Sequence, residues 1–271
     1  MNDLEAFAKL VQALDPWRGQ MIFIGGWGHR LHTLHPDAQK QAFEPVFTRD
    51  TDLAFANRAP LEGNIKAALA AHGFNEEFSG TSKPPAAHYT LGNEENGFYA
   101  EFLTPLMEPP FKRNGEPNAT AAVAGISAHK IAHLGVLLED PWIVTVGPEV
   151  GVPLDRPVDL QVANPLCFMV QKFLILKDRT RNKRQQDLLY VHDTLLLFGH
   201  MLPQLKHTWN AIVKPTLHAR EVATVEREIQ EAFSGVTPDI QGATRIPRDR
   251  ELDPAEFLAT CQFSFAIILG P

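Results

Sequence analysis

The chain has 271 residues, of which 44% are hydrophobic and 21% are charged. This balance is that of a globular protein, and it excludes a disordered chain, a collagen and a coiled coil. A chain of this length buries a sizeable core without disulfides or metal ions. The two cysteines lie singly in apolar neighbourhoods, which predicts neither a disulfide framework nor a zinc knuckle. The formal net charge of −7 argues against a protein that coats nucleic acid indiscriminately.

Apolar segments of the sequence are too short to cross a membrane. The longest runs include TLLLFGHML at 194–202 and the terminal FSFAIILG, both well below the roughly 20 residues that a bilayer requires. Near the N-terminus, Asp3, Glu5 and Lys9 interrupt what would have to be the apolar core of a signal peptide. We therefore expect a cytoplasmic protein without a membrane partner.

The first part of the chain alternates between helical and strand patterns. Apolar residues recur at helical spacing over 3–14, and alternating or continuous apolar runs typical of strands follow. In chain order we expect a helix at 3–14, a strand running into the glycines of MIFIGG at 21–26, a strand at 46–56, a helix at 61–72, and strands at 88–91 and 98–103 joined by a turn at 92–97. This order predicts a mixed sheet with helices on it.

The pattern changes in the second half of the chain. Prolines at 141, 148, 153, 157 and 165 break the periodicity, and successive helical patterns follow them. We expect helices at 165–178, 184–201, 203–213, 218–233 and 254–267, with a loop at 235–253. The predicted fold class is therefore α+β, with an α/β domain at 1–160 and a mainly helical domain at 161–271.

The segment TRDTDL at 48–53 carries two acids on one predicted strand. Alternate residues of a strand point to the same side, so Asp50 and Asp52 present both carboxylates to one face of the sheet. Converging carboxylates repel one another unless a cation lies between them. Mg²⁺ takes oxygen ligands and is commonly bound by one or two carboxylates and substrate phosphates. Glu101, on a later predicted strand, joins this pair if the two strands are neighbours.

Two glycines, Gly25 and Gly26, follow the first predicted strand. Without side chains, their backbone can approach a triphosphate closely, and a helix beginning there would offer free N–H groups to it. Walker and G-x-G-x-x-G motifs are absent from the sequence, which argues against kinase, P-loop and dinucleotide-binding classes.

The combination of IGGW at 24–27, TRDTDL at 48–53 and AEFLTP at 100–105 resembles the nucleotidyltransferase superfamily that shares the DNA polymerase β-like palm. The chain looks most like bacterial nucleotidyltransferase-like families related to AbiEii toxins of toxin–antitoxin systems. This resemblance implies a nucleotidyltransferase palm followed by a helical domain that completes the nucleotide site. It also implies Mg²⁺, or Mn²⁺ in its place, bound by Asp50, Asp52 and Glu101.

The implied reaction is attack of an acceptor hydroxyl on the α-phosphate of an NTP, with loss of pyrophosphate. The acceptor would be an RNA such as tRNA, or a protein, and an antitoxin would be a further partner. Glu101 would complete the metal site or act as general base. The resemblance assigns nucleotide binding to the following residues of this sequence: Gly25, Gly26, Arg30, Thr48, Lys172, Arg179, Arg181, Lys183 and Asp187.

A local excess of positive charge concerns the nature of the acceptor, because nucleic acids carry phosphates. The stretch 172–184 holds six basic residues and one acid, an excess that favours phosphate binding but also fits a solvated helix end. Lys183 and Asp187 are four residues apart on one helix face, which predicts that Asp187 orients Lys183.

Two positions depart from the family pattern. Trp27 follows the glycines where a small or hydroxyl residue is common, and Glu101 replaces the usual aspartate. They motivate an alternative, a palm-fold protein that binds a nucleotide or a partner without transferase activity. A metal-dependent phosphohydrolase using the same acids is a third reading. Histidines at 29, 32, 35, 129 and 133 have spacings that could bind zinc, but without a nearby cysteine or HExxH glutamate we expect structural roles.

Overall fold

The computed structural model describes residues 2–46, 48–55, 61–79, 86–92 and 97–270, and all structural statements concern these residues. It confirms the predicted fold class, a mixed β-sheet with helices and a mainly helical C-terminal part. The chain divides into two compact units. The first comprises Met1–His35 and Phe47–Ala163, and the second comprises Pro36–Val46 and Asn164–Pro271. The segment 36–46 thus belongs to the helical unit, whereas the predicted domains at 1–160 and 161–271 placed it in the first domain.

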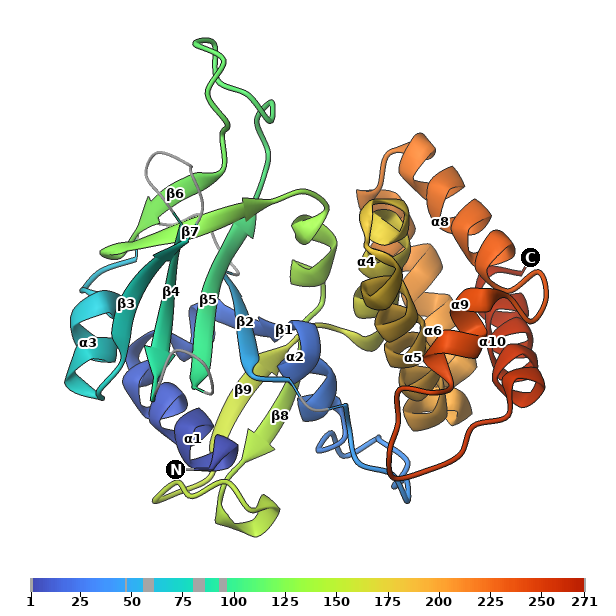
Figure 1. Cartoon of the computed structure of the whole chain (residues 1–271), viewed down its shortest axis with the longest axis horizontal. Helices are drawn as coiled ribbons and strands as arrows, with labels where there is room; N and C mark the ends of the chain where they lie inside the picture. The colour runs from blue at the N-terminus through green and yellow to red at the C-terminus, as the bar shows by residue number, and fades with distance from the viewer. Residues whose placement is uncertain (1, 47, 56–60, 80–85, 93–96, 271) are drawn as a thin grey trace. The chain divides into compact units, whose positions relative to one another are not determined.

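The first unit is built on a nine-stranded mixed sheet, counted over the described residues. Its main path has the order β3-β4-β5-β2-β1-β9-β8, and the hairpin of β6 and β7 pairs with β5. Strands β3, β4 and β5 lie side by side in Figure 1, and β2 is the parallel neighbour of β5. The strands are β1 Met21–Ile24, β2 Asp50–Phe55, β3 Asn75–Ser79, β4 Ala86–Leu91, β5 Phe98–Pro105, β6 Thr120–Val123, β7 Ile126–Ile131, β8 Trp142–Val146 and β9 Val158–Val162.

Three helices accompany this sheet: α1 Asp3–Ala13, α2 Gly25–His32 and α3 Ile65–Ala71. Helix α1 begins with a capping box in which the side chains of Asn2 and Glu5 each accept a hydrogen bond from the other's backbone N–H. Its apolar side packs into the core, where Phe7 meets the sheet residue Phe23 edge to face at 5.5 Å. Helix α2 follows β1 directly, so the local sequence MIFIGGW places a helix start at a strand end.

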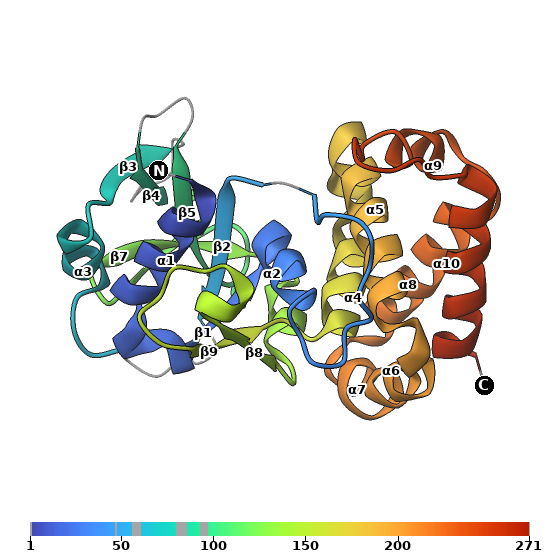
Figure 2. The same ribbon diagram turned by 90° about the horizontal axis from the view of Figure 1, so that it is seen from below.

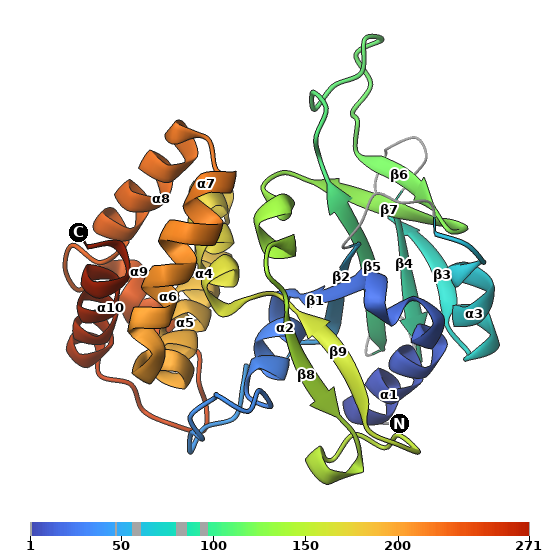
Figure 3. The same ribbon diagram turned by 180° about the vertical axis from the view of Figure 1, so that it is seen from behind.

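The second unit is a group of helices with the segment 36–46 packed against them (Figures 2 and 3). Gln39 donates its backbone N–H to the Leu197 carbonyl at 2.9 Å, and Glu44 donates to Asp249 Oδ2 at 2.8 Å. The helices are α4 Pro165–Ile175, α5 Arg181–Phe198, α6 Leu202–Thr208, α7 Lys214–Thr216, α8 Ala219–Ala232, α9 Pro238–Ala243 and α10 Pro254–Leu269.

Some predicted elements differ from those observed. The predicted loop at 235–253 contains α9, whose Thr237 accepts a hydrogen bond from the Ile240 N–H as an N-cap. Strands β3 and β6 to β9 were not predicted; they are short, with four to six residues each. The predicted turn at 92–97 lies in part outside the described residues, as do the ends of the predicted strand at 46–56. None of the helices in the described residues has both the length and the apolarity needed to cross a membrane.

Candidate active site

Three carboxylates lie on one face of the sheet, at the centre of its main path. Asp50 and Asp52 are alternate residues of β2, and Glu101 lies on β5. In the parallel pairing of these strands Asp52 is the register partner of Glu101, and Asp50 is the partner of Tyr99. Paired residues of adjacent strands point to the same side, so all three carboxylates and the phenol share one face. The structure therefore brings the predicted acids together.

The opposite face of the same strands is the core. The residues between the acids are buried, whereas Asp50, Asp52 and Glu101 are each partly exposed. This alternation is the expected pattern of a sheet with one packed and one accessible face. The buried residues are Thr51, Leu53, Ala100 and Phe102.

Gly25 begins helix α2 directly beside the acidic pair. Its φ of 62° lies in the left-handed region that favours glycine. A Cβ at this position would overlap the Asp52 carboxylate. The Asp52 side chain thus lies against the backbone at the start of the helix, where N–H groups can receive an anion. This close approach explains why the first residue of the Gly25-Gly26 pair is a glycine.

The phenol of Tyr99 lies within the field of the three acids. Burial raises the pKa of the Tyr99 phenol to about 12, and the charges of Asp50, Glu101 and Asp52 contribute to the same shift. A phenolate is disfavoured there because it would add a fourth negative charge. The perturbation shows that all three carboxylates act on one small region of the sheet.

The acidic face can hold a metal ion only together with other ligands. Among the described residues, no three acidic, histidine or cysteine side chains are close enough to hold one metal ion together. A Mg²⁺ ion bound with a nucleotide does not need three, since one or two carboxylates and phosphate oxygens complete its ligands. Asp50 and Asp52 fit that arrangement, because they share a face beside the backbone at Gly25.

Other predicted residues of the first unit lie around this face. Trp27 is 1% exposed and stacks on Phe7 with ring centroids 4.2 Å apart, so it is a core residue that does not fill the space at the glycines. The guanidinium of Arg30 lies 4.8 Å from the Trp27 ring centroid. Thr48 donates its hydroxyl to the Asp50 carbonyl at 3.5 Å and thereby supports the turn into β2.

In the second unit, Asp187 is the centre of a buried ion-pair network. Its carboxylate is 2.8 Å from Lys172 Nζ and 3.0 Å from Arg179 Nε. Asp187 is 2% exposed and Lys172 is 6% exposed. Asp187 therefore orients Lys172 and Arg179, where sequence spacing had predicted Lys183. A charge buried this deeply needs such partners, because its desolvation is costly.

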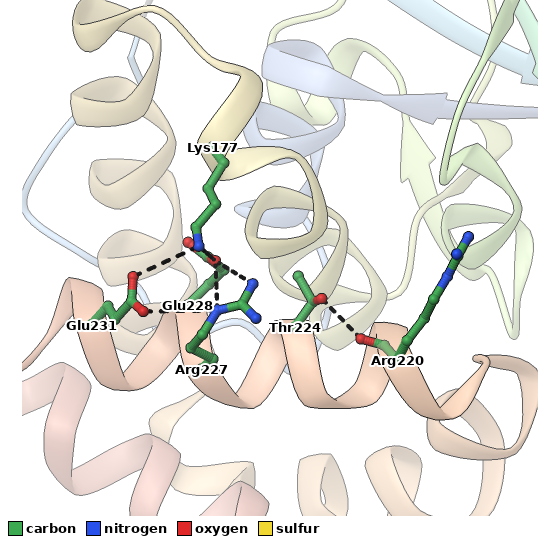
Figure 4. Close-up of polar contacts among 6 residues, drawn as sticks. All are labelled: Lys177, Arg220, Thr224, Arg227, Glu228 and Glu231. Carbon is green, nitrogen blue, oxygen red and sulfur yellow. Dashed lines mark hydrogen bonds and ion pairs between the residues drawn. The ribbon is translucent and has the colours of Figure 1, made fainter.

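The remaining basic residues of the 172–184 stretch are unequally engaged. Lys177 is 3.0 Å from Glu228 on α8, which also receives Arg227 (Figure 4), and Arg184 is 2.9 Å from Asp239. Arg181 and Lys183, by contrast, are exposed in the first turn of α5. Much of the local positive charge is thus paired within this unit, and Arg181 and Lys183 are exposed cations outside these pairs.

The histidines of the HRLHTLH segment take up structural positions. His32 is fully buried, and its Nε2 lies 2.7 Å from the Ala163 carbonyl. Burial lowers the pKa of His32 to about 3. His29 is also fully buried, and His35 packs on Trp142 with ring centroids 4.3 Å apart. This part of the chain forms no zinc cluster with other described residues.

Sequence reasoning missed three further polar residues on the acidic face. His88 on β4 is the register partner of Glu101, Thr90 is the partner of Tyr99, and Glu77 on β3 is the partner of His88. A signal was present, since His88 and Thr90 alternate with apolar residues on a strand next to the acid-bearing one. The predicted turn at 92–97 already makes the strands of His88 and Glu101 neighbours, whereas the pairing of β3 with β4 was not predicted.

The comparison with protein families decides the classification. Residues 2–214 match the model of a family described as Nucleotidyltransferase. The chain belongs to this nucleotidyltransferase family. No curated protein matches the chain. The matched region of this nucleotidyltransferase contains the acidic face of the first unit and the network around Asp187 in the second, and it ends before α8.

Proposed function

We propose that this nucleotidyltransferase transfers a nucleoside monophosphate from an NTP to a hydroxyl group of RNA, in a reaction that depends on Mg²⁺ or Mn²⁺. The observation that carries the proposal is the alignment of Asp50, Asp52 and Glu101 on one face beside the start of α2. Family membership supports the transfer chemistry in general terms. The metal ion, the acceptor and the residue roles are the proposed part.

Each group on the acidic face has a defined task in this proposal. Asp50 and Asp52 would hold the divalent ion, which would stabilise negative charge on the attacking and leaving oxygens. The backbone at Gly25 and Gly26 accommodates the phosphates at the N-terminus of α2. Glu101 contacts the attacking hydroxyl, as a metal ligand or as the group that takes its proton. The new bond joins the acceptor oxygen to the α-phosphorus, and pyrophosphate leaves with the bond that breaks.

RNA is favoured as the acceptor by exposed groups of two kinds. Arg181 and Lys183 are exposed cations at the start of α5, and such groups bind phosphates without regard to sequence. On the acidic face, the partly exposed rings of Tyr99 and His88 offer surfaces on which an unpaired base can stack. The roles of Lys172, Arg179 and Asp187 in nucleotide binding stay predictions.

The test is an incubation of the purified chain with α-labelled NTPs, Mg²⁺ and either total RNA or protein lysate. Label in RNA that is lost in Asp50→Asn and Asp52→Asn supports the proposal. Asp159→Asn is the matched control, because Asp159 is an exposed acid on β9 of the same sheet and bonds to Thr145. Label found in protein instead of RNA would identify protein as the acceptor. Absence of transfer with every NTP would contradict the proposal.

The alternative is a binding protein without transferase activity, and it was motivated by Trp27 and Glu101. The position of Trp27 no longer argues for it. Trp27 is buried against Phe7 and leaves the space beside Gly25 to the Asp52 carboxylate. Glu101 lies next to Asp52 in register despite its longer side chain. A calorimetric titration separates the two functions, since NTP binding that survives Asp50→Ala and Asp52→Ala without turnover would favour the alternative.

The resemblance to AbiEii-type families extends the proposal to a toxin that acts with an antitoxin. Controlled expression in a bacterial host is the corresponding experiment. We expect growth arrest with the wild-type chain and normal growth with Asp52→Asn at equal protein level. Equal growth with both chains would contradict a toxin role and leave the transfer proposal intact.

A further inference from the structure

A row of polar side chains continues the acidic face beyond Glu101. Glu77 on β3, His88 on β4 and Glu101 on β5 are successive register partners across three neighbouring strands. Directly opposed residues of antiparallel strands have Cβ atoms about 5 Å apart. The row therefore leads from the third carboxylate of the candidate active site to a histidine and then to a second glutamate.

The Glu77 carboxylate is fixed through both of its oxygens. Its Oε2 is 3.1 Å from His88 Nε2, and its Oε1 receives the Thr90 hydroxyl at 2.6 Å. An ionised carboxylate only accepts hydrogen bonds, so His88 Nε2 carries the proton and donates it. In the neutral ring this leaves Nδ1 as a hydrogen-bond acceptor. No hydrogen bond to Nδ1 is found within the described part of the chain.

The surroundings of His88 keep the ring both oriented and accessible. The Tyr99 ring lies edge to face against it, with centroids 5.7 Å apart and an interplanar angle of 66°. The His88 side chain is nevertheless 22% exposed, and that of Glu77 is 29% exposed. A pair exposed to this degree contributes little to stability, typically below about 1 kcal/mol. The pair therefore does little for the fold, and it leaves the ring accessible to a ligand.

The direction of the reaction places the acceptor on this side of the acids. In phosphoryl and nucleotidyl transfer, the attacking and leaving oxygens lie roughly in line on opposite sides of the phosphorus. The phosphates are proposed to lie at the start of α2, which follows β1 on one side of β2. The attacking hydroxyl then comes from the other side of β2, where β5 and β4 present Glu101, Tyr99 and His88.

We propose that His88 binds the acceptor hydroxyl through Nδ1, and that Glu77 and Thr90 are positioning residues that hold its ring in this orientation. This inference rests on the proposed function and assigns the acceptor side of the same site. Tyr99 supports the ring from its edge. The ligand that His88 receives is thus a neutral hydroxyl, whose single hydrogen is donated to the ring nitrogen and passes to Nδ1 when the oxygen bonds to the α-phosphorus. Of its two proposed tasks Glu101 then keeps that of a metal ligand.

Two substitutions at His88 separate its two nitrogen atoms. His88→Asn places an amide oxygen near the position of Nδ1, whereas His88→Gln places an amide nitrogen near that of Nε2. We expect His88→Asn to keep a measurable part of the activity and His88→Gln to lose as much as His88→Ala. A role in packing alone would not rank the variants in this order, because Gln fills the space of the ring better than Asn.

The positioning residues have a matched control on the same strand. Glu77→Gln and Thr90→Val disturb the carboxylate that orients His88. Glu76→Gln makes the same charge change one residue earlier, where the side chain points to the other face and accepts the Tyr89 hydroxyl at 2.9 Å. Melting temperatures of all variants identify any loss of fold.

The experiment measures label transfer from the NTP to total RNA as a function of RNA and of NTP concentration. For His88→Ala we expect the KM for RNA to rise, or kcat to fall, by about two- to tenfold, the effect of one lost hydrogen bond. The Kd for Mg-NTP measured by calorimetry should not change. Glu77→Gln and Thr90→Val should change the KM for RNA or kcat in the same direction by a smaller factor, with the Kd for Mg-NTP unchanged. Glu76→Gln should change none of these constants.

The outcomes distinguish this inference from the proposed function. Wild-type kinetics in His88→Ala would overturn the inference while transfer itself stands. Loss of Mg-NTP binding in His88→Ala would also overturn it, because the residue would then belong to the nucleotide side. If the wild-type chain binds Mg-NTP and transfers nothing to RNA or protein, both the acceptor subsite and the proposed transfer are contradicted, and nucleotide binding stands alone.

Discussion

Carboxylates of the two units are used in opposite ways. In the second unit, Asp187 and Asp193 are almost fully buried, and each lies within hydrogen-bonding distance of a cation. Arg250 donates to both oxygens of Asp193 at 2.7 and 2.6 Å. In the first unit, Asp50, Asp52 and Glu101 lie next to one another on a partly exposed face. The acids of the acidic face are neighbours of like charge, whereas these two buried acids of the second unit are paired with cations.

The difference separates structural acids from candidate catalytic ones. A buried carboxylate that is paired with a cation is needed where it is, because removal of either partner leaves an uncompensated charge. Neighbouring carboxylates on one face repel each other, so their arrangement costs stability unless a cation binds. Substitutions in the two groups should therefore affect different properties, with activity lost in one and stability lost in the other.

The largest effect is expected at the acidic face. Asp50→Asn and Asp52→Asn should each reduce transfer on the order of 10³-fold, because the ion that stabilises the transition state loses a ligand. The melting temperature of Asp50→Asn should not fall, since one of several mutually repelling charges is removed. Parallel measurement of label transfer and thermal unfolding checks this. A variant that loses activity only in proportion to lost stability would contradict a catalytic role.

The next effect is expected at the buried pair of the second unit. Asp187→Asn should lower the free energy of unfolding by about 3–5 kcal/mol, because Lys172 is left as a buried charge with a weakened partner. Asp239→Asn is the control, since the pair of Arg184 and Asp239 is partly exposed and should contribute at most about 1 kcal/mol. Denaturant unfolding measures both. Equal stabilities for the two variants would contradict the structural assignment of Asp187.

A smaller effect is expected from acid at His32. Burial lowers the pKa of His32 from 6.5 to about 3 in the folded chain, so the unfolded chain binds the proton more readily. The corresponding stability is present above pH 6.5 and is lost as the pH falls toward 3. At pH 5 the loss attributable to His32 is about 2 kcal/mol. Denaturant unfolding from pH 7 to 5 should show this slope, reduced in His32→Gln; the same slope in both chains would contradict it.

The smallest effect is expected at Gly25. Gly25→Ala introduces a side chain at a φ of 62°, where the strain for other residues is about 1–2 kcal/mol, and its Cβ displaces the Asp52 carboxylate. We expect that modest loss of stability together with weaker Mg-NTP binding in calorimetry. Gly19→Ala is the control, because a Cβ there has no atom within 4 Å. Unchanged nucleotide affinity in Gly25→Ala would separate the glycine from the nucleotide site.

Local patterns of the sequence predicted the parts of the fold that depend on neighbouring residues. The common face of Asp50 and Asp52 follows from the period of a strand, and the helix after Gly25-Gly26 begins where the motif indicated. Asp187 shows the limit of such reasoning, because helix spacing predicted Lys183 as its partner and the packing of α4 against α5 provides Lys172.

The pairing of strands that are far apart in the chain could not be predicted from the sequence. Strand β1 has β9 as its parallel neighbour, far along the chain, and β9 lies among prolines that hide its alternation. The parallel pairing of β2 with β5 across β3 and β4 decides that Glu101 lies next to Asp52. The antiparallel pairings of β4 with β5 and of β3 with β4 then align His88 and Glu77 with Glu101.

The central claim is that Asp50, Asp52 and Glu101 form a metal and nucleotide site. A crystal structure of the chain soaked with NTP and Mn²⁺ tests it most directly, because the anomalous signal of Mn²⁺ locates the ion independently of the nucleotide. We expect an anomalous peak in contact with Asp50, Asp52 and the NTP phosphates, beside Gly25. An NTP and ion bound elsewhere, with the acidic face free of both, would contradict the account.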